Sequence, residues 1–307
     1  MDTGAFMALE ANRPLTLLLG GGYTLQRVAD KLPVGSFIIT SRSEEQCARW
    51  RQRGWLAYQL DNTDQLALAR LFAENSGLQI VVDSVPPLRT GPSDIQCNSD
   101  NSQHGVRSVV QAISNTAVKR IIYLSTTGVF GVRDGSWVDE STAPAPWNSQ
   151  GAARLASEET YREGISAINA AGAKCAFTAL RLPAIYGPDR GVAVSLRMGT
   201  YHLVGDGSQW TNRIHVEDLA TIILRCIEFR GVLPPVICVN DDYPTQARDV
   251  VLYICGREKL PMPPSVSADE VLKRGAYTML SNQRVRNSLM KAVLGVSLKY
   301  PSFREGT

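Results

Sequence analysis

The sequence has 307 residues, a length typical of one large domain or two smaller ones. Hydrophobic residues make up 44% and charged residues 20%, a balance that supports a buried core and excludes an intrinsically disordered chain. The 32 Lys and Arg against 29 Asp and Glu give a net charge of +3, and these cations are spread singly along the chain. A nucleic-acid-binding protein clusters its cations on one face, so we expect no nucleic-acid partner.

The sequence also lacks the patterns of membrane, secreted and metal-binding proteins. No apolar run approaches the roughly 20 residues of a membrane span, and residues 1–14 do not resemble a secretion signal. The six cysteines include no C-x-x-C pair, and the three histidines are far apart in sequence. We therefore predict buried free thiols and no metal site in a cytoplasmic protein without a membrane partner, either a monomer or a homodimer.

Strand and helix patterns alternate through the first 182 residues. The expected strands are 15–20, 36–40, 55–60, 80–83, 120–125 and 175–182. The expected helices are 23–32, a helix capped by Ser43, 64–75, a helix ending near 115, and 151–171. Strands separated by helices predict a parallel sheet with right-handed crossovers. The remaining segments are a loop at 131–149, a mixed region after 187 with helices 216–230 and 245–256, and a short strand at 236–240.

A glycine-rich turn follows the first strand and opens the first helix. Gly20 permits the tight turn, and Gly22 allows a pyrophosphate to approach the backbone at the helix N-terminus. The third glycine of the G-x-G-x-x-G pattern is replaced by Leu25, which predicts a slightly displaced helix or weaker binding. A plain glycine-rich turn remains the alternative. Tyr23 and Thr24 complete the candidate cofactor-binding turn.

The second strand ends in Ser41 and Arg42 instead of a carboxylate. An acidic residue here binds the ribose of NAD, whereas an arginine with neighbouring hydroxyls suits the 2′-phosphate of NADP. We therefore expect NADP, with NAD as the alternative cofactor; a surface arginine at a helix start is the other interpretation. Asp61 follows the third strand and is expected either to contact adenine or to cap the helix at 64–75.

Four sequence stretches resemble an atypical extended short-chain dehydrogenase/reductase of the NAD-dependent epimerase/dehydratase type. The stretches are LLLGGGYTLQRVA at the glycine turn, YLSTTGVFG (123–131) with WVDEST (137–142), LRLPAIYGPDR (180–190) and RIHVEDLA (213–220). VNDDYPT (239–245) and YPSFREG (300–306) resemble the terminal pieces of one subgroup. Each stretch is short, but their combination spans almost the whole chain.

The resemblance implies a fold and a division of the chain. It implies an α/β architecture with a doubly wound parallel (Rossmann) sheet in a NAD(P)-binding domain at 1–187. A smaller mixed α/β substrate lobe would occupy 188–307, with strand 236–240 returning to the main sheet. We add Val85, Pro86 and Pro183, which follow two of the expected strands, to the candidate cofactor contacts.

The resemblance also implies catalytic positions, at two of which this chain has residue types that differ from those of the family. The family's hydroxyl at the end of the fifth strand corresponds to Thr126, beside Ser125 and Thr127. The family's Tyr and Lys, four residues apart, correspond to Gln150 and Arg154, and no Y-x-x-x-K occurs anywhere in the sequence. Because glutamine cannot exchange a proton as a phenol does and arginine stays charged, the family's proton route is missing.

Three functional interpretations remain open from the sequence. The first is an active oxidoreductase or epimerase on a small carbonyl or sugar-like substrate, with a substituted acid such as Tyr186 or a water held by Thr126. The second is a non-catalytic NADP(H)-binding sensor or scaffold. The third is an enzyme on a nucleotide-linked substrate that uses the His215 or Glu140 region, although a histidine in R-I-H-V-E-D more often bridges two lobes.

Overall fold

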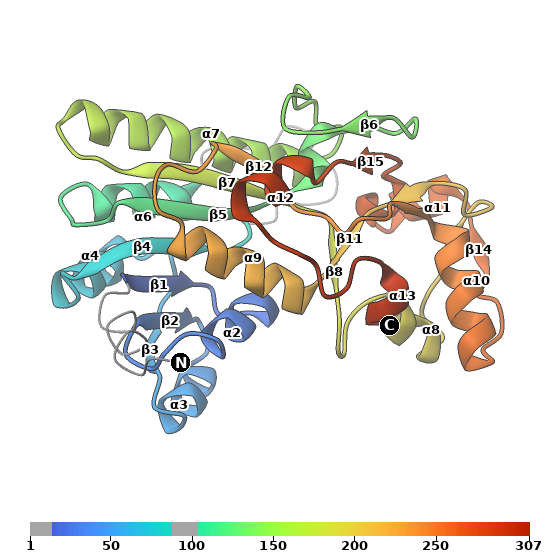
Figure 1. Cartoon of the computed structure of the whole chain (residues 1–307), viewed down its shortest axis with the longest axis horizontal. Helices are drawn as coiled ribbons and strands as arrows, with labels where there is room; N and C mark the ends of the chain where they lie inside the picture. The colour runs from blue at the N-terminus through green and yellow to red at the C-terminus, as the bar shows by residue number, and fades with distance from the viewer. Residues whose placement is uncertain (1–13, 88–102) are drawn as a thin grey trace.

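The protein is built around one parallel sheet, whose strands lie one below another in Figure 1. The computed structural model describes residues 14–87 and 103–307. The sheet has the order β12-β7-β5-β4-β1-β2-β3, and every pair is parallel. Its strands are β1 (Leu15–Leu19), β2 (Phe37–Ser41), β3 (Leu56–Gln59), β4 (Leu78–Asp83), β5 (Arg120–Thr126), β7 (Ala176–Leu182) and β12 (Val236–Cys238). The order reverses between β1 and β4, which is where doubly wound sheets bind their ligands.

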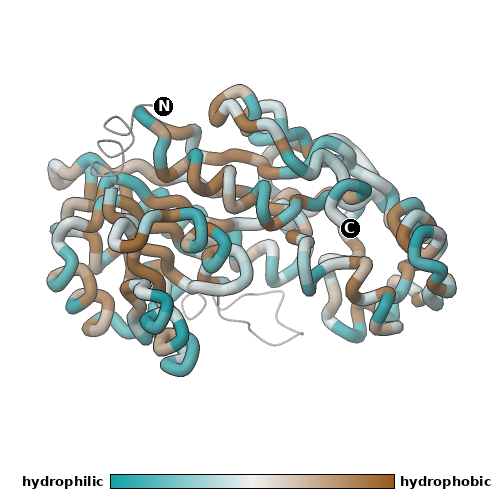
Figure 2. The backbone as a smooth tube through the Cα atoms, turned by 60° about the horizontal axis from the view of Figure 1, so that its bottom comes forward, coloured by the Kyte–Doolittle hydropathy of each residue, from teal (hydrophilic) through white to brown (hydrophobic). Residues whose placement is uncertain are grey.

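Helices cover both faces of this sheet, so its strands are buried on both sides. One face packs against α2 (Tyr23–Ala29), α3 (Glu44–Gln52), α9 (Val216–Glu228) and α12 (Ser288–Leu294). The other face packs against α4 (Gln65–Glu74), α6 (His104–Ile113) and α7 (Ser149–Ala170). Figure 2 shows the hydrophobic segments gathered in the central strands between these layers. This is the Rossmann-like α/β architecture expected from the alternation of strands and helices.

A smaller mixed α/β lobe lies beyond the carboxyl ends of the sheet strands (Figure 1). Its short strands pair as β8 (Ala184–Tyr186) with β11 (Arg213–His215), β9 (Leu203–Val204) with β14 (Ser265–Val266), and β10 (Trp210–Thr211) with β13 (Thr245–Gln246). At its edge β6 (Trp137–Val138) pairs with β15 (Arg284–Val285). The lobe's helical segments are α8 (Val192–Arg197), α10 (Ala247–Glu258), α11 (Ala268–Lys273) and α13 (Phe303–Gly306), and the 3-10 turns are η1 (Thr127–Phe130) and η2 (Tyr277–Leu280).

The expected elements are present with shifted ends. The helix expected over 23–32 ends at Ala29, because residues 30–33 form turns before the next strand. Ser43 caps α3 as predicted, its hydroxyl accepting from the Gln46 N–H at 3.2 Å. The helix expected over 151–171 begins two residues earlier, where the Asn148 side chain accepts from the Gly151 N–H. Side-chain caps thus fix helix starts that hydrophobic spacing alone leaves uncertain.

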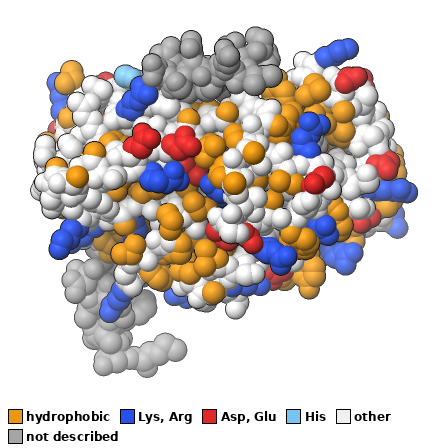
Figure 3. Space-filling model, turned by 90° about the horizontal axis from the view of Figure 1, so that it is seen from above, with side chains coloured by type: hydrophobic (Ala, Val, Ile, Leu, Met, Phe, Trp, Pro, Cys, Tyr) orange, Lys and Arg blue, Asp and Glu red, His pale blue; other side chains and the backbone are white. Residues whose placement is uncertain are grey.

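The described cysteines are buried free thiols, as expected, and charged residues of both signs are mixed on the surface. Cys47, Cys175, Cys226, Cys238 and Cys255 are buried free thiols, and Cys97 lies outside the described residues. Burial raises the pKa of the Cys175 thiol to about 11 and that of Cys226 to about 12. On the face seen in Figure 3, cationic and anionic side chains are interspersed among hydrophobic ones. None of the helices in the described part of the chain has the length and apolar character needed to span a bilayer.

Candidate functional site

The glycine turn between β1 and α2 has one closed side and one open side. Gly20 has a φ of +83°, and a Cβ there would lie 2.8 Å from the Val85 side chain. Glycine is therefore required at this position both by backbone conformation and by space. A Cβ on Gly22 would meet no atom within 4 Å. The turn consequently leaves its backbone accessible at Gly22, as a bound pyrophosphate requires.

Leu25, which replaces the third glycine, is a core residue. Its side chain is fully buried beside Val28 in the cluster that α2 forms with α9 and the sheet. The close approach lies instead at Gly21, where a Cβ would be 2.4 Å from the Trp50 ring and 2.8 Å from Ile39. In this turn the close approach that the motif assigns to its third glycine is made by the second residue, and the slightly displaced helix or weaker binding expected from Leu25 stays a prediction.

The end of β2 presents an uncommitted cation. The Arg42 side chain is exposed, while the Ser41 hydroxyl accepts from the Ser43 N–H at 3.1 Å. Asp61 accepts from both the backbone and the hydroxyl of Thr63, and these bonds, with a smaller contribution from Arg42, lower the pKa of Asp61. Asp61 does not cap the following helix as one alternative held, since the cap of α4 is Asp64.

The remaining candidate cofactor residues surround this turn from three directions. The Tyr23 hydroxyl donates to the Pro188 carbonyl at 2.7 Å, and Thr24 is buried beneath it in α2. The Val85 N–H donates to Asp83 at the end of β4, whereas Pro86 is exposed. Pro183 is half-buried between β7 and β8. The structure thus brings the ends of β1, β4 and β7 to the same edge of the sheet (Figure 1).

Ser125 and Thr126, at the end of β5, differ in the hydrogen bonds that their hydroxyl groups form. The Ser125 hydroxyl donates to Glu158 at 2.5 Å, and Glu158 forms a buried ion pair with Arg181 at 2.9 Å. Ser125 is therefore bound into the core. Thr126 is half-buried, and its hydroxyl oxygen accepts from the Gly128 N–H at 3.1 Å. Among the described residues no protein group accepts the hydroxyl hydrogen of Thr126, so this group can still donate to a ligand.

Arg154 is anchored at the ends of β4 and β5. Its Nη1 donates to the Tyr123 hydroxyl at 3.0 Å and to the Leu124 carbonyl at 2.9 Å, and it lies 3.5 Å from the Val85 carbonyl. The nearby Asp83 is fully buried, and desolvation raises the pKa of its carboxyl to about 6 although Arg154 and two hydrogen bonds oppose the shift. Gln150 lies one turn earlier on α7 and is half-buried.

The side chains considered as substitute acids are held by the protein itself. The Tyr186 hydroxyl donates to the Ser302 carbonyl at 3.0 Å, and burial raises the pKa of this phenol. His215 accepts from the Glu217 N–H through Nδ1, stacks on Tyr300 with ring centroids 3.7 Å apart, and has its pKa lowered by burial. These contacts give Tyr186 and His215 structural roles between the lobes, which argues against either as the proton donor.

Glu140 is also bound by the protein. Its carboxylate accepts from the Cys238 N–H at 2.7 Å, at the edge strand β12. The two candidates of the third interpretation, His215 and Glu140, are therefore both engaged in backbone hydrogen bonds.

A pocket of about 380 Å³ opens in the smaller lobe. Hydroxyl side chains dominate its polar lining, which also includes an imidazole, an amide and a guanidinium, and none of its lining residues is acidic. The polar members are Ser195, Thr200, Tyr201, His202, Gln209, Thr211, Arg274 and Thr278. Ala247, Val266, Val271, Ala276 and Met279 supply the apolar part. Many hydroxyl groups beside an apolar surface suit a polyhydroxylated ligand with an uncharged or anionic character.

Comparison with known proteins decides the family. A model of the NAD dependent epimerase/dehydratase family matches residues 19–237. The chain belongs to this family. The matched range begins at the end of β1 and ends within β12, so it contains the candidate cofactor and catalytic residues, whereas the pocket residues from Ala247 to Met279 lie beyond it.

Relatives within and around the family differ in how far they match. The N-acetyl-alpha-D-glucosaminyl-diphospho-ditrans,octacis-undecaprenol 4-epimerase of Escherichia coli O157:H7 is 28% identical over 168 residues, which cover 53% of this chain and 49% of that protein. The chain thus matches about half the length of this curated relative. A functionally unknown conserved protein from Silicibacter pomeroyi DSS has a TM-score of 0.70 at 29% identity, covering 95% of each chain.

More distant structures share the fold alone. The UDP-glucuronic acid 4-epimerase from Bacillus cereus, in complex with NAD, has a TM-score of 0.76 at 14% identity over 95% of each chain. A putative NAD-dependent epimerase/dehydratase from Methylobacillus flagellatus has a TM-score of 0.69 at 22% identity over 96% of each chain. The family architecture therefore persists here although the sequence has diverged widely.

Several residues that shape the site escaped the sequence analysis. Asp83 could have been noticed, because an acidic residue ending the apolar run IVVD is unusual. The Glu158–Arg181 pair joins α7 to β7 and has no local sequence pattern. The pocket residues come from the irregular region after 187, where spacing predicts little.

Proposed function

We propose that the protein is a NAD(P)-dependent oxidoreductase or epimerase acting on a small carbonyl or sugar-like substrate. The family match carries this proposal, supported by a glycine turn that is open at Gly22. A bound dinucleotide would supply hydride transfer there. This chain's residues would hold it through Gly20, Gly22 and neighbouring groups at the ends of β1, β2, β4 and β7.

The open side of the turn gives a direct test of cofactor binding. Gly22→Ala should leave the fold intact, because its Cβ meets no protein atom, yet it should weaken NADH and NADPH binding at least tenfold by filling the cofactor's space. Gly77→Ala is the matched control, since its Cβ also makes no close contact and lies before β4, at the opposite end of the strand. Equal affinity in wild type and Gly22→Ala, measured by calorimetry, would contradict this cofactor site.

We also propose a preference for NADP over NAD. The exposed Arg42 at the end of β2 supports it, because this guanidinium forms no ion pair within the described residues and Ser41 adds a hydroxyl. Arg42→Ala should weaken NADPH binding about tenfold while changing NADH binding little, since only the former carries a 2′-phosphate. Equal affinities for the two cofactors, unchanged in the variant, would reject the preference.

The substrate pocket in the smaller lobe supports a sugar-like ligand. Its five hydroxyl side chains and absence of acidic lining residues fit a polyhydroxylated or phosphate-linked molecule. The curated relative is named as an epimerase of a diphosphate-linked amino sugar, and several neighbouring structures contain UDP-sugars and NAD. Saturation-transfer NMR with UDP-sugars and simple aldehydes would rank these classes, and Thr278→Val, at a hydroxyl that lines the pocket, should weaken the preferred one.

The presence or absence of a proton donor distinguishes the enzyme from the alternative function, a non-catalytic NADP(H)-binding sensor. Because Tyr186 and His215 are engaged by the protein, we propose a water held by the free hydroxyl hydrogen of Thr126 as the donor. Anchoring of Arg154 by backbone and phenol oxygens favours the sensor instead, since that guanidinium cannot relay protons. Two assays together decide between them: NADPH consumption with aldehydes and ketones, which detects a reductase, and analysis of sugar products for a changed configuration, which detects a redox-neutral epimerase.

The family pair supplies a second discriminating experiment. The double variant Gln150→Tyr with Arg154→Lys should create weak reductase activity if the native protein only binds cofactor. In an enzyme that uses Gln150 and Arg154 for its own substrate, the same change should abolish activity. We further propose a division near residue 187, with the cofactor domain before it and the substrate lobe after it; limited proteolysis within 187–191 would test this boundary.

A further inference from the structure

A tight hairpin joins the end of β8 to α8 and lies against the glycine turn. The Gly187 and Arg190 backbones exchange two hydrogen bonds, at 3.0 and 3.1 Å, and Asp189 between them has a φ of +62°. Gly191 follows with a φ of +120°, and a Cβ there would lie 2.9 Å from the Tyr186 side chain. The positive φ values and the two backbone hydrogen bonds define the course of this hairpin, from which the exposed Arg190 side chain extends.

Tyr23 docks the hairpin onto the first residue of α2. Its hydroxyl donates to the Pro188 carbonyl at 2.7 Å, and a Cβ on Gly187 would lie 2.9 Å from that hydroxyl oxygen. Burial raises the pKa of the Tyr23 phenol, so the group remains a neutral donor. This contact joins the residue directly after Gly22 to the hairpin, across 165 positions of sequence.

Two arginines flank the Tyr23 ring, and they differ in their partners. The Arg27 guanidinium lies 3.9 Å from the ring centroid, donates to the Tyr23 carbonyl, and pairs with Glu217 at 3.6 Å. The Arg190 guanidinium lies 5.3 Å from the same centroid, is exposed, and forms no ion pair with any carboxylate of residues 14–87 and 103–307. Arg190 is thus the cation at this turn whose charge the protein leaves unneutralised.

We propose that Arg190 is a cofactor-binding residue, which the hairpin 187–191 presents to the glycine turn and which pairs with the pyrophosphate of a bound dinucleotide. The proposal rests on the proposed cofactor site. The open space over Gly22 lies next to Tyr23, and Arg190 lies over the Tyr23 ring. An unneutralised guanidinium beside a site for two phosphate charges provides charge-assisted hydrogen bonds and reaches the cofactor from the opposite side of the cleft.

Calorimetric titration with NADPH and with ADP-ribose tests the role of Arg190. Arg190→Gln should weaken binding of both ligands about tenfold, because both carry the pyrophosphate. Arg190→Lys keeps the positive charge but loses the two-pronged hydrogen-bonding geometry of the guanidinium, so its affinity for both ligands should lie between those of wild type and Arg190→Gln. The dependence of Kd on salt should also decrease in Arg190→Gln, since one charge contact is removed. Arg230→Gln, an exposed arginine outside the site, serves as the matched control.

The outcomes separate this role from the proposed function. A Kd for Arg190→Gln within twofold of wild type overturns the role of Arg190 while leaving the cofactor site intact. A loss confined to NADPH, with ADP-ribose unaffected, also overturns the pyrophosphate contact. A wild-type protein that binds neither ligand contradicts both proposals. Thermal unfolding of Arg190→Gln should match wild type, and Tyr23→Phe, which releases Pro188, should weaken NADPH binding less than Arg190→Gln does.

Discussion

Thr126 is the residue on which the enzymatic interpretation depends most directly. Its oxygen accepts from the Gly128 N–H while its hydrogen remains available, whereas the neighbouring Ser125 is committed to Glu158. If turnover occurs, Thr126→Val should reduce kcat at least about tenfold, because the hydrogen bond that holds the proton-donating water is lost. Thr126→Ser keeps the hydroxyl and should retain most of the activity. Equal loss in both variants would contradict a role that depends on the hydroxyl alone, because Thr126→Ser keeps that group.

Asp83 should make stability depend on pH. Desolvation raises the pKa of this fully buried carboxyl from 3.8 to about 6 in the folded protein, so folding favours its protonated form. The stabilisation is fully present below pH 3.8 and is lost as pH rises through about 6. A shift of this size corresponds to roughly 3 kcal/mol. The unfolding free energy of wild type relative to Asp83→Asn should therefore fall by that amount between pH 4 and pH 8, measured with urea; no pH dependence of the difference would contradict the shift.

At the scale of single residues, the sequence predicts positions better than partners. Gly20 forms the tight turn and Ser43 the helix cap that their local patterns indicated, because turns and caps depend on a few adjacent residues. The engagement of Tyr186 by Ser302 joins residues 116 positions apart, and no local pattern contains it. Candidate catalytic groups were therefore identifiable by type, but which of them stay free could be known only from the fold.

The glycine turn and its two neighbouring elements form one packed unit. A Cβ on Gly21 would lie 2.4 Å from Trp50 of α3 and 2.8 Å from Ile39 of β2. Gly21→Ala should lower the unfolding free energy by about 1–3 kcal/mol, because both neighbours are buried and must shift. Gly77→Ala, whose Cβ would be 3.9 Å from Leu15, is the control. Equal stability of the two variants in thermal unfolding would show that the Trp50 side chain moves freely.

At the scale of elements, the length of a strand or helix determines whether its position can be predicted from the sequence. The six expected strands of the sheet are present within one or two residues of their expected ends, because continuous apolar runs are typical of strands buried on both faces. The two-residue strands β6, β9, β10, β13, β14 and β15 were not expected individually, since two residues carry no periodicity. The smaller lobe is built mainly from such pairs, which explains why its pocket was unforeseen.

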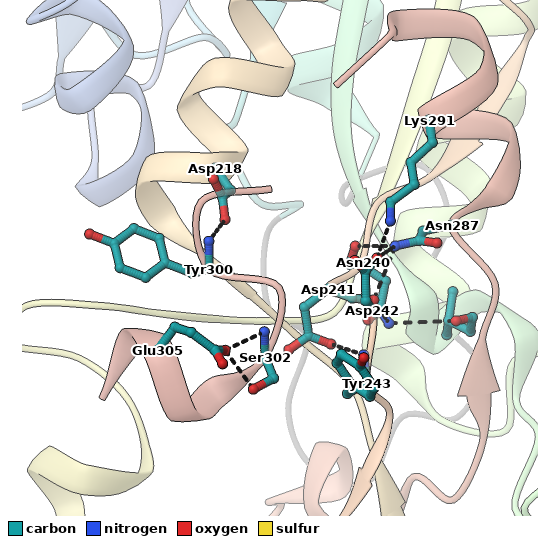
Figure 4. Close-up of polar contacts among 11 residues, drawn as sticks. Asp218, Asn240, Asp241, Asp242, Tyr243, Asn287, Lys291, Tyr300, Ser302 and Glu305 are labelled. Carbon is teal, nitrogen blue, oxygen red and sulfur yellow. Dashed lines mark hydrogen bonds and ion pairs between the residues drawn. The ribbon is translucent and has the colours of Figure 1, made fainter. Parts of the chain in front are cut away.

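The segment 299–307 ties the two parts of the molecule together. The Asp218 carboxylate at the start of α9 accepts from the Tyr300 N–H (Figure 4) and from the Lys299 N–H. The Asp242 N–H donates to the Pro301 carbonyl. Farther along, a Cβ on Gly306 would lie 2.6 Å from the Tyr186 hydroxyl. The segment therefore contacts α9, the turn after β12, and β8, which are far apart in sequence.

Breaking this anchor should loosen the whole molecule. Asp218→Ala leaves two backbone donors without their acceptor and should lower the unfolding free energy by about 2–4 kcal/mol. It should also speed proteolytic cleavage near residue 299. Asp206→Ala is the comparison, because that carboxylate serves only a local exposed turn with Ser208. Cleavage at the same rate in both variants would show that other contacts hold the segment.

The reactivity of the buried thiols reports where the protein unfolds locally. Cys47 and Cys226 are inaccessible in one core, Cys175 lies in the other, and Cys255 lies in the smaller lobe. A thiolate is the form that attacks alkylating reagents, and burial suppresses it at each of these positions. The rate at which each cysteine is alkylated, measured by mass spectrometry, would therefore show which part of the protein opens first. A bound dinucleotide that stabilises the sheet should slow the labelling of Cys47 and Cys226 more than that of Cys255.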